Sequence, residues 1–138
     1  MKDWNSAIVT AYMATLTGAG INTYNGIVPD SETPGNKYVV INAISAVENS
    51  DKNSFDGNIS VLLDIITIGE AVLNYSDSWS MANTIKGLIN SKANPDLSPD
   101  FYCSLTSLPS ETEFIQSTVN QKVLRRLIRF EHFIGQIT

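Results

Sequence analysis

Residues 57–68 form the longest strand pattern in the chain, and both faces of this strand are apolar. Every second position on one face is aliphatic, at Ile59, Val61, Leu63 and Ile65. The other face carries Leu62 and Ile66 beside Ser60 and Asp64. A strand with two largely apolar faces has to be covered on both. The pattern therefore predicts a strand at the centre of a sheet, or one that is covered at an interface.

A run of turn-forming residues separates a short extended segment, residues 21–24, from the next strong strand, residues 38–47. Pro29 favours a type I turn, and the Pro34-Gly35 pair favours a type II turn with a positive φ at Gly35. Regular strand pairing is therefore expected to begin near Lys37, before a β-branched sequence. Residues 48–54 are polar and aperiodic, which predicts a loop.

Two segments show the three- and four-residue spacing of amphipathic helices. The first is capped by Asp3 and ends at residues 18–20, and its apolar stripe comprises Trp4, Ala7, Ile8, Ala11, Tyr12 and Leu16. The second is capped within residues 76–78 and is closed by Pro95, and its predicted buried stripe comprises Trp79, Ala82, Ile85, Leu88 and Ile89. Both stripes are expected to pack against one face of the sheet.

The last part of the chain contains two more predicted strands. Residues 101–108 are typical of a strand that ends at Pro109. Residues 121–130 fit either a helix or a strand, and the β-branched and aromatic residues of the second half favour a strand. The order of elements predicts an α+β fold, a largely antiparallel mixed sheet with two helices packed on one face. A length of 138 residues predicts a single domain, 1–138.

Little in the sequence points to catalysis. His132 is the single histidine, and without a nucleophile signature it is expected to be hydrogen-bonded or on the surface. Cys103 is the single cysteine and is expected to be a small buried hydrophobe. The acidic residues lack metal-ligand spacing, and no phosphate-binding glycine pattern follows a strand. We therefore expect no enzyme activity, no cofactor and no metal. The sequence also contains no apolar run long enough to span a membrane.

The net charge of −5 at pH 7 argues against a protein that wraps nucleic acid. Yet four of the nine basic residues crowd into the last strand, at Lys122, Arg125, Arg126 and Arg129. They either form a solvated or salt-bridging face or contact a neighbouring subunit. In the second case their partners are acids such as Glu48, Asp51 and Asp56. Direct nucleic-acid binding is a third alternative.

Taken together, the elements resemble the tail-terminator (tail-completion) proteins of long-tailed bacteriophages. The resemblance rests on the N-terminal helix, on residues 23–26 and 34–41, on the strand at 59–67, on the helix at 82–89 and on the basic-aromatic strand at 125–130. It implies a structural virion protein that forms a hexameric ring, caps the finished tail tube, ends its polymerisation and provides the surface on which the head docks.

The resemblance also implies the partners of the protein and its place. The partners are other copies of the chain, the tail tube protein and a head-completion or neck protein. Genomic DNA would pass through the lumen without specific binding, since a negative wall does not trap phosphates. The protein would be assembled in the host cytoplasm and lie in the tail or neck region of the virion. The turn-rich residues 23–36 would then be a contact loop or a simple crossing between sheet edges.

Two alternatives remain at this stage. The first is a head-completion or neck connector protein at the portal–tail junction, which has a similarly small and non-catalytic profile. The second is a non-viral α+β ligand-binding module, with a pocket that contains Trp4, Tyr12 and Trp79. Two tryptophans on helix stripes are more often part of a core.

Overall fold

The computed structural model describes residues 3–28, 35–48, 56–69, 75–90, 92, 94–117 and 121–137. Over these ranges, helices and strands follow one another in the predicted order. They are α1 (Trp4–Gly18), β1 (Thr23–Asn25), β2 (Lys37–Glu48), β3 (Asp56–Gly69), α2 (Tyr75–Leu88), β4 (Phe101–Ser117) and β5 (Lys122–Gln136). The predicted α+β fold is confirmed.

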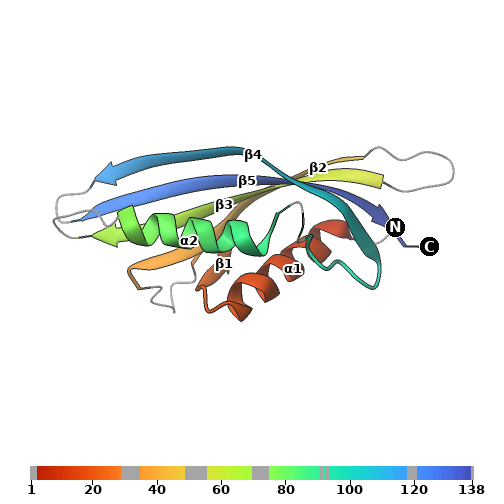
Figure 1. The fold of residues 1–138 in the computed structure, drawn as a ribbon, viewed down its shortest axis with the longest axis horizontal. Coiled ribbons are helices and arrows are strands. Elements are labelled where there is room, and N and C mark those ends of the chain that lie inside the picture. Colours follow the sequence, from red (N-terminus) through yellow and green to blue (C-terminus); the bar gives the residue numbers. More distant parts are fainter. Residues whose placement is uncertain are drawn as a thin grey trace.

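The five strands of the described part of the chain form one sheet in the order β1-β2-β3-β5-β4 (Figure 1). Only the β1–β2 pair is parallel, and the β2–β3, β3–β5 and β4–β5 pairs are antiparallel. β3 therefore lies at the centre, as its two apolar faces predicted. The chain leaves β3 through α2, reaches the far edge at β4 and returns as β5 between β4 and β3.

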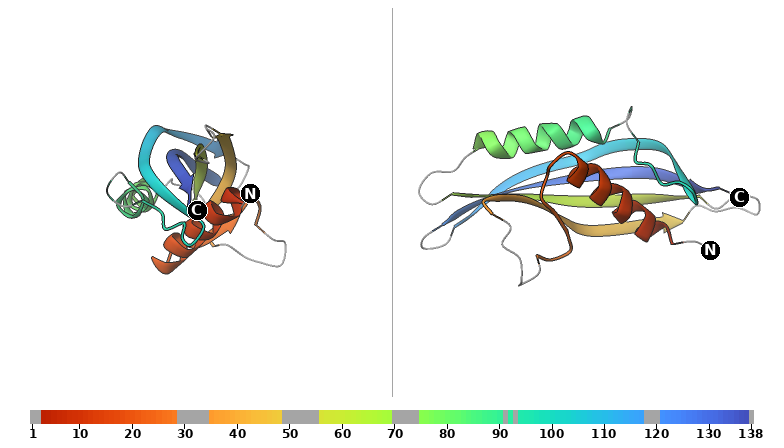
Figure 2. Two further views of the ribbon diagram at one scale, coloured as in Figure 1. Left: turned by 90° about the vertical axis from the view of Figure 1, so that its right-hand side faces the viewer. Right: turned by 90° about the horizontal axis from the view of Figure 1, so that it is seen from below.

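Both helices lie on the same face of the sheet, which is twisted and elongated along its strands (Figure 2). α1 contacts β1 and α2, and α2 contacts β3 and β5. We call this side the helix face and the opposite side the open face. Within the described ranges, no helix is long and apolar enough to cross a membrane.

The core lies between the helices and the helix face of the sheet. α1 contributes Ile8, Tyr12 and Leu16, and α2 contributes Ala82 and Ile85. The strands contribute alternate residues, among them Val39, Ile41, Ile59, Val61, Leu63, Ile65, Ile128, Phe130 and Ile134. The even positions of β5 are thus inside, which confirms the strand assignment for this ambiguous segment.

Local signals at two element boundaries act as predicted. Asp3 caps α1, since its Oδ1 accepts hydrogen bonds from the backbone N–H groups of Asn5 and Ser6 at 3.0 and 3.3 Å. Gly35 has φ = +80°, the conformation that the predicted type II turn requires. Residues 29–34 of that turn-rich run, and residues 49–54 of the predicted loop, lie outside the described residues, while Glu48 of that loop is the last residue of β2.

One prediction about packing is wrong, and a second holds only in part. Trp79 is 49% exposed instead of buried, because it lies on the outer side of α2 beside Tyr75, with ring centroids 5.8 Å apart. The neighbouring Ser78 takes the buried position in that turn. Leu88 is only half-buried, while Ile89 is buried just beyond the end of the helix.

Pro109 does not end its strand, since β4 continues from Phe101 to Ser117. Proline cannot donate to a strand ladder and is tolerated where the ladder is broken or at an edge. Both conditions hold here, because β4 is an edge strand and its register against β5 shifts between Ser107 and Ser110. Pro109 has no N–H to donate, but on an edge strand and at a break in the ladder no strand pairing depends on that hydrogen bond.

Candidate assembly interface

The open face of the sheet carries two of the four basic residues of β5 that the sequence analysis singled out. Directly paired residues of an antiparallel sheet share a face, so the register places Arg125, Leu127 and Arg129 on the open face. Half-buried apolar side chains of β3, Leu62 and Ile66, lie beside them. This face combines apolar surface with charge, which is typical of surfaces that contact other proteins.

Arg125 pairs with Asp64 of β3 on this face. The guanidinium Nε lies 3.0 Å from Asp64 Oδ2, and Nη2 donates to the same oxygen. The Phe114 ring from β4 packs against the guanidinium, 5.1 Å from its centroid. The bond to Asp64 raises the pKa of Arg125 above its ordinary value. Because the Asp64 carboxylate is buried, the pair holds three strands together at this point.

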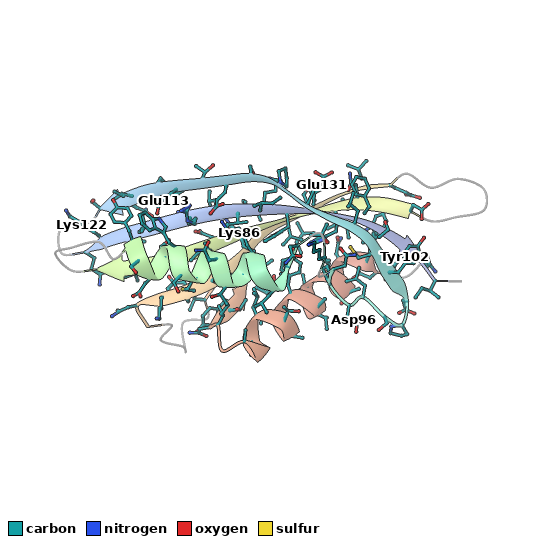
Figure 3. All side chains as sticks on the ribbon, viewed as in Figure 1. Lys86, Asp96, Tyr102, Glu113, Lys122 and Glu131 are labelled. Atoms are coloured by element: carbon teal, nitrogen blue, oxygen red, sulfur yellow. The ribbon has the colours of Figure 1, made fainter. Side chains whose placement is uncertain are left out.

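Arg126 lies on the helix face of β5, opposite to Arg125. Its Nη1 is 3.1 Å from Glu111 and its Nη2 is 3.9 Å from Glu113, both on β4. Lys86 of α2 also reaches Glu111, at 3.0 Å. Figure 3 labels Lys86 and Glu113. These pairs tie α2 to the edge strand, so the salt-bridging interpretation is confirmed for Arg125 and Arg126.

Lys122 and Arg129 differ from these two, because neither has an ion-pair partner within the described part of the chain. Lys122 is exposed at the start of β5, at one extreme end of the molecule (Figure 3). Arg129 is half-buried on the open face, between Leu62 of β3 and Ser110 of β4. They are the two cations of the predicted set that remain available to another molecule.

The predicted acidic partners lie at the opposite end of the sheet. Glu48 ends β2 and is exposed, and Asp56 begins β3 and is half-buried. The register places Asp56 opposite Gly135, at the far end of β5 from Lys122. Asp51 lies outside the described residues. Acids and bases of the set are therefore not brought together within one subunit. Glu48 and Asp56 lie at one end of the sheet, Lys122 lies at the other, and Arg129 lies at the middle of β5.

The sequence analysis did not identify the acids that pair within the subunit, Asp64, Glu111 and Glu113. For Asp64 the sequence did contain a signal of an ion pair, because a carboxylate in the middle of an apolar central strand needs a cation near it. The β3–β5 register, which brings Asp64 next to Arg125, was not predictable from the sequence. Glu111 and Glu113 were missed because the strand was expected to end at Pro109.

His132 is fully buried on the helix face of β5 and belongs to a chain of hydrogen bonds. Thr106 donates to Asn94 Oδ1 at 2.6 Å, so its oxygen accepts from His132 Nδ1 at 2.9 Å. With Nδ1 protonated, the other nitrogen, Nε2, accepts from the Tyr12 hydroxyl. The chain links α1 to both C-terminal strands, and it confirms a hydrogen-bonded His132.

Burial keeps this network uncharged. It lowers the pKa of His132 to about 4 and raises the pKa of Tyr12 well above its ordinary value. Cys103 is half-buried rather than buried, and its Sγ lies 3.8 Å from His132 Nδ1. Burial also raises the pKa of this thiol, and Nδ1 already serves Thr106. The pair therefore lacks the free base and the thiolate of a nucleophilic site.

Two further features bear on ligand binding. A groove of about 530 Å³ lies between α1 and residues 96–101 and is lined mainly by small and polar side chains. The pocket expected from Trp4, Tyr12 and Trp79 is not formed, since Tyr12 is buried in the core and Trp79 is on the outside of α2. Within the described ranges, no group of three His, Cys, Asp or Glu side chains is placed to hold a metal ion.

Comparison with known proteins adds one finding about the fold. No protein-family model matches the chain, and no curated protein sequence matches it. A solved structure described as the virion of a native gene transfer agent particle contains a chain with a TM-score of 0.69 to this one, at 14% sequence identity. The match covers 94% of this chain and 92% of the other. The protein therefore shares its fold, over nearly its whole length, with a chain of that gene transfer agent virion.

Proposed function

We propose that this protein is a structural component of a virion, of the tail-terminator kind. It forms a ring, of six copies as the family resemblance implies. The ring caps the tail tube, ends tube growth and gives the head a surface to dock on. The observation that carries the proposal is the fold shared with a chain of a gene transfer agent particle over 94% of the sequence. That likeness supports a virion component, and the tail-terminator role comes from the sequence resemblance.

The charge distribution supports assembly from identical copies. Lys122 at one end of the sheet and Arg129 at the middle of β5 have no ion-pair partner in the described residues, and Glu48 and Asp56 lie at the end opposite to Lys122. Complementary ends on one chain favour head-to-tail contacts, which close into a ring when the rotation between copies allows it. Because the whole chain is acidic, DNA would slide through such a ring without being held.

The experiment that tests the proposal is the assembly of particles without this protein. A tail terminator stops tube growth, so particles that lack it should carry tails of irregular length, measured by electron microscopy. Tails of normal length that fail to join heads would instead indicate a head-completion or neck connector protein. Intact particles of normal length and infectivity would contradict a role at either place.

Complementation with variants tests the contact surface. The double variant Lys122→Glu with Arg129→Glu should fold but fail to restore tail length, because it removes the two available cations. A matched control, Lys37→Glu with Lys92→Glu, changes the net charge equally at exposed positions outside this set. If both double variants restore normal tails, Lys122 and Arg129 are not part of the interface.

A further inference from the structure

The C-terminal half of α2 is firmly held to the rest of the fold. Ile85 is fully buried against the sheet, and Ile89 is buried just beyond the end of the helix. Lys86 reaches Glu111 of the edge strand at 3.0 Å. The Asn90 side chain donates a hydrogen bond to the Lys86 carbonyl at 2.9 Å, so the last turn of the helix is capped. Apolar packing, an ion pair and a cap therefore anchor this end.

The N-terminal half of α2, residues 75–81, has much weaker contacts with the sheet. The only side chain that it buries is a polar one, Ser78. Met81 is half-buried against the core, whereas the rings of Tyr75 and Trp79 are exposed. Because burial of apolar surface is what holds an amphipathic helix to a sheet, little of this contribution is available to the N-terminal half.

Two hydroxyl groups are buried without a hydrogen-bond partner in the described part of the chain, and both belong to this region. One is the Ser78 hydroxyl on the buried side of α2. The other is the hydroxyl of Thr67, which is buried on the helix face of β3. A hydroxyl that loses water without gaining a partner destabilises the state in which it is buried.

The register places Thr67 beneath the N-terminal half of α2. The ion pair of Lys86 with β4 is level with Ile128 of β5, and Thr67 is level with Leu124. These levels are four residues apart, roughly 13 Å at about 3.3 Å per residue. Ser78 precedes Lys86 by eight helical residues, roughly 12 Å at about 1.5 Å per residue. Since α2 begins beside the end of β3 (Figure 1), the two hydroxyls lie at the same level of one interface.

We propose that the N-terminal half of α2 is a movable arm, which opens from the sheet while the C-terminal half stays anchored. Opening returns the hydroxyls of Ser78 and Thr67 to water and exposes little apolar surface, which is typical of the low-stability parts of a fold. The arm carries Tyr75 and Trp79, so its movement changes the position of both exposed rings. The inference concerns the single subunit and does not depend on the proposed ring.

Native-state hydrogen exchange of the isolated protein, followed by NMR, tests the arm. Amides 79–82 of α2 are compared with amides 8–11 of α1, which occupy the same positions counted from the start of their helix. Ordinary fraying of a helix end therefore affects both sets alike. After correction for intrinsic rates, amides 79–82 should exchange at least about tenfold faster than amides 8–11 and than amides 86–89. Equal rates in the three sets would overturn the proposal.

Two variants test the cause of the opening. Ser78→Ala removes the buried hydroxyl, and the matched control Ser80→Ala makes the same change at an exposed position of the arm, with the same gain in helix propensity. Thr67→Val removes the second hydroxyl and leaves α2 unchanged. Ser78→Ala and Thr67→Val should each slow exchange of amides 79–82 by about tenfold relative to Ser80→Ala. If neither variant slows this exchange more than the control does, the buried hydroxyls do not open the arm and the proposal is wrong.

Discussion

The buried histidine gives the protein a specific sensitivity to acid. His132 is neutral in the folded protein because burial lowers its pKa to about 4, against an ordinary value of 6.5. As pH falls below 6.5, the unfolded chain takes up this proton before the folded protein does. The stabilising effect of the neutral imidazole is therefore complete above pH 6.5 and is lost progressively between pH 6.5 and 4. The loss is about 2.5 kcal/mol at pH 4.5 and approaches about 3.4 kcal/mol at lower pH.

The variant His132→Gln isolates this effect, because an amide keeps one donor and one acceptor but does not titrate. The free energy of unfolding is measured by urea denaturation of both proteins at pH 7.5 and pH 4.5. Carboxylates affect both proteins alike, so wild type should lose about 2.5 kcal/mol more than the variant over this interval. Equal losses would show that His132 titrates normally in the folded state, and would refute the buried network with Tyr12 and Thr106.

Three further changes follow from the packing. Ile85→Ala truncates a fully buried side chain of α2 and should cost about 2–5 kcal/mol in urea denaturation, whereas a loss below about 1 kcal/mol would contradict its burial. Arg125→Ala leaves the buried Asp64 carboxylate without its cation and should destabilise by about 1–3 kcal/mol, with Asp64→Asn in the same variant recovering part of the loss. Gly57→Ala places a methyl group against the Trp4 ring and should quench or shift tryptophan fluorescence, and an unchanged spectrum and stability would exclude that contact.

Much of the fold was predictable because local signals and hydrophobic period agreed. The alternation in residues 57–68 identified the central strand, and the aromatic and β-branched second half of β5 identified a strand where a helix was equally possible. Pro109 misled because its effect depends on whether the strand is at an edge, which the sequence around it does not show. The prediction for Trp79 was wrong because helical spacing shows which residues share a stripe but not which of them the core covers.

The candidate interface was only partly predictable for a related reason. The basic residues of β5 were recognised because four of the nine in the chain crowd into this strand. Alternation, however, places Arg125 and Arg126 on opposite faces, where each meets acids of its own subunit. Which acids those are depends on the register between strands that are far apart in sequence. Lys122 and Arg129 could be separated from the other two only when that register was known.

The central claim is that identical copies close into a ring at the end of a tail tube, and electron microscopy of the purified protein mixed with tail tubes tests it most directly. The account predicts closed rings, with the six-fold symmetry implied by the family resemblance, seated at one end of each tube and absent when Lys122→Glu with Arg129→Glu is used. Tubes with bare ends beside a protein that light scattering shows to be monomeric would contradict it.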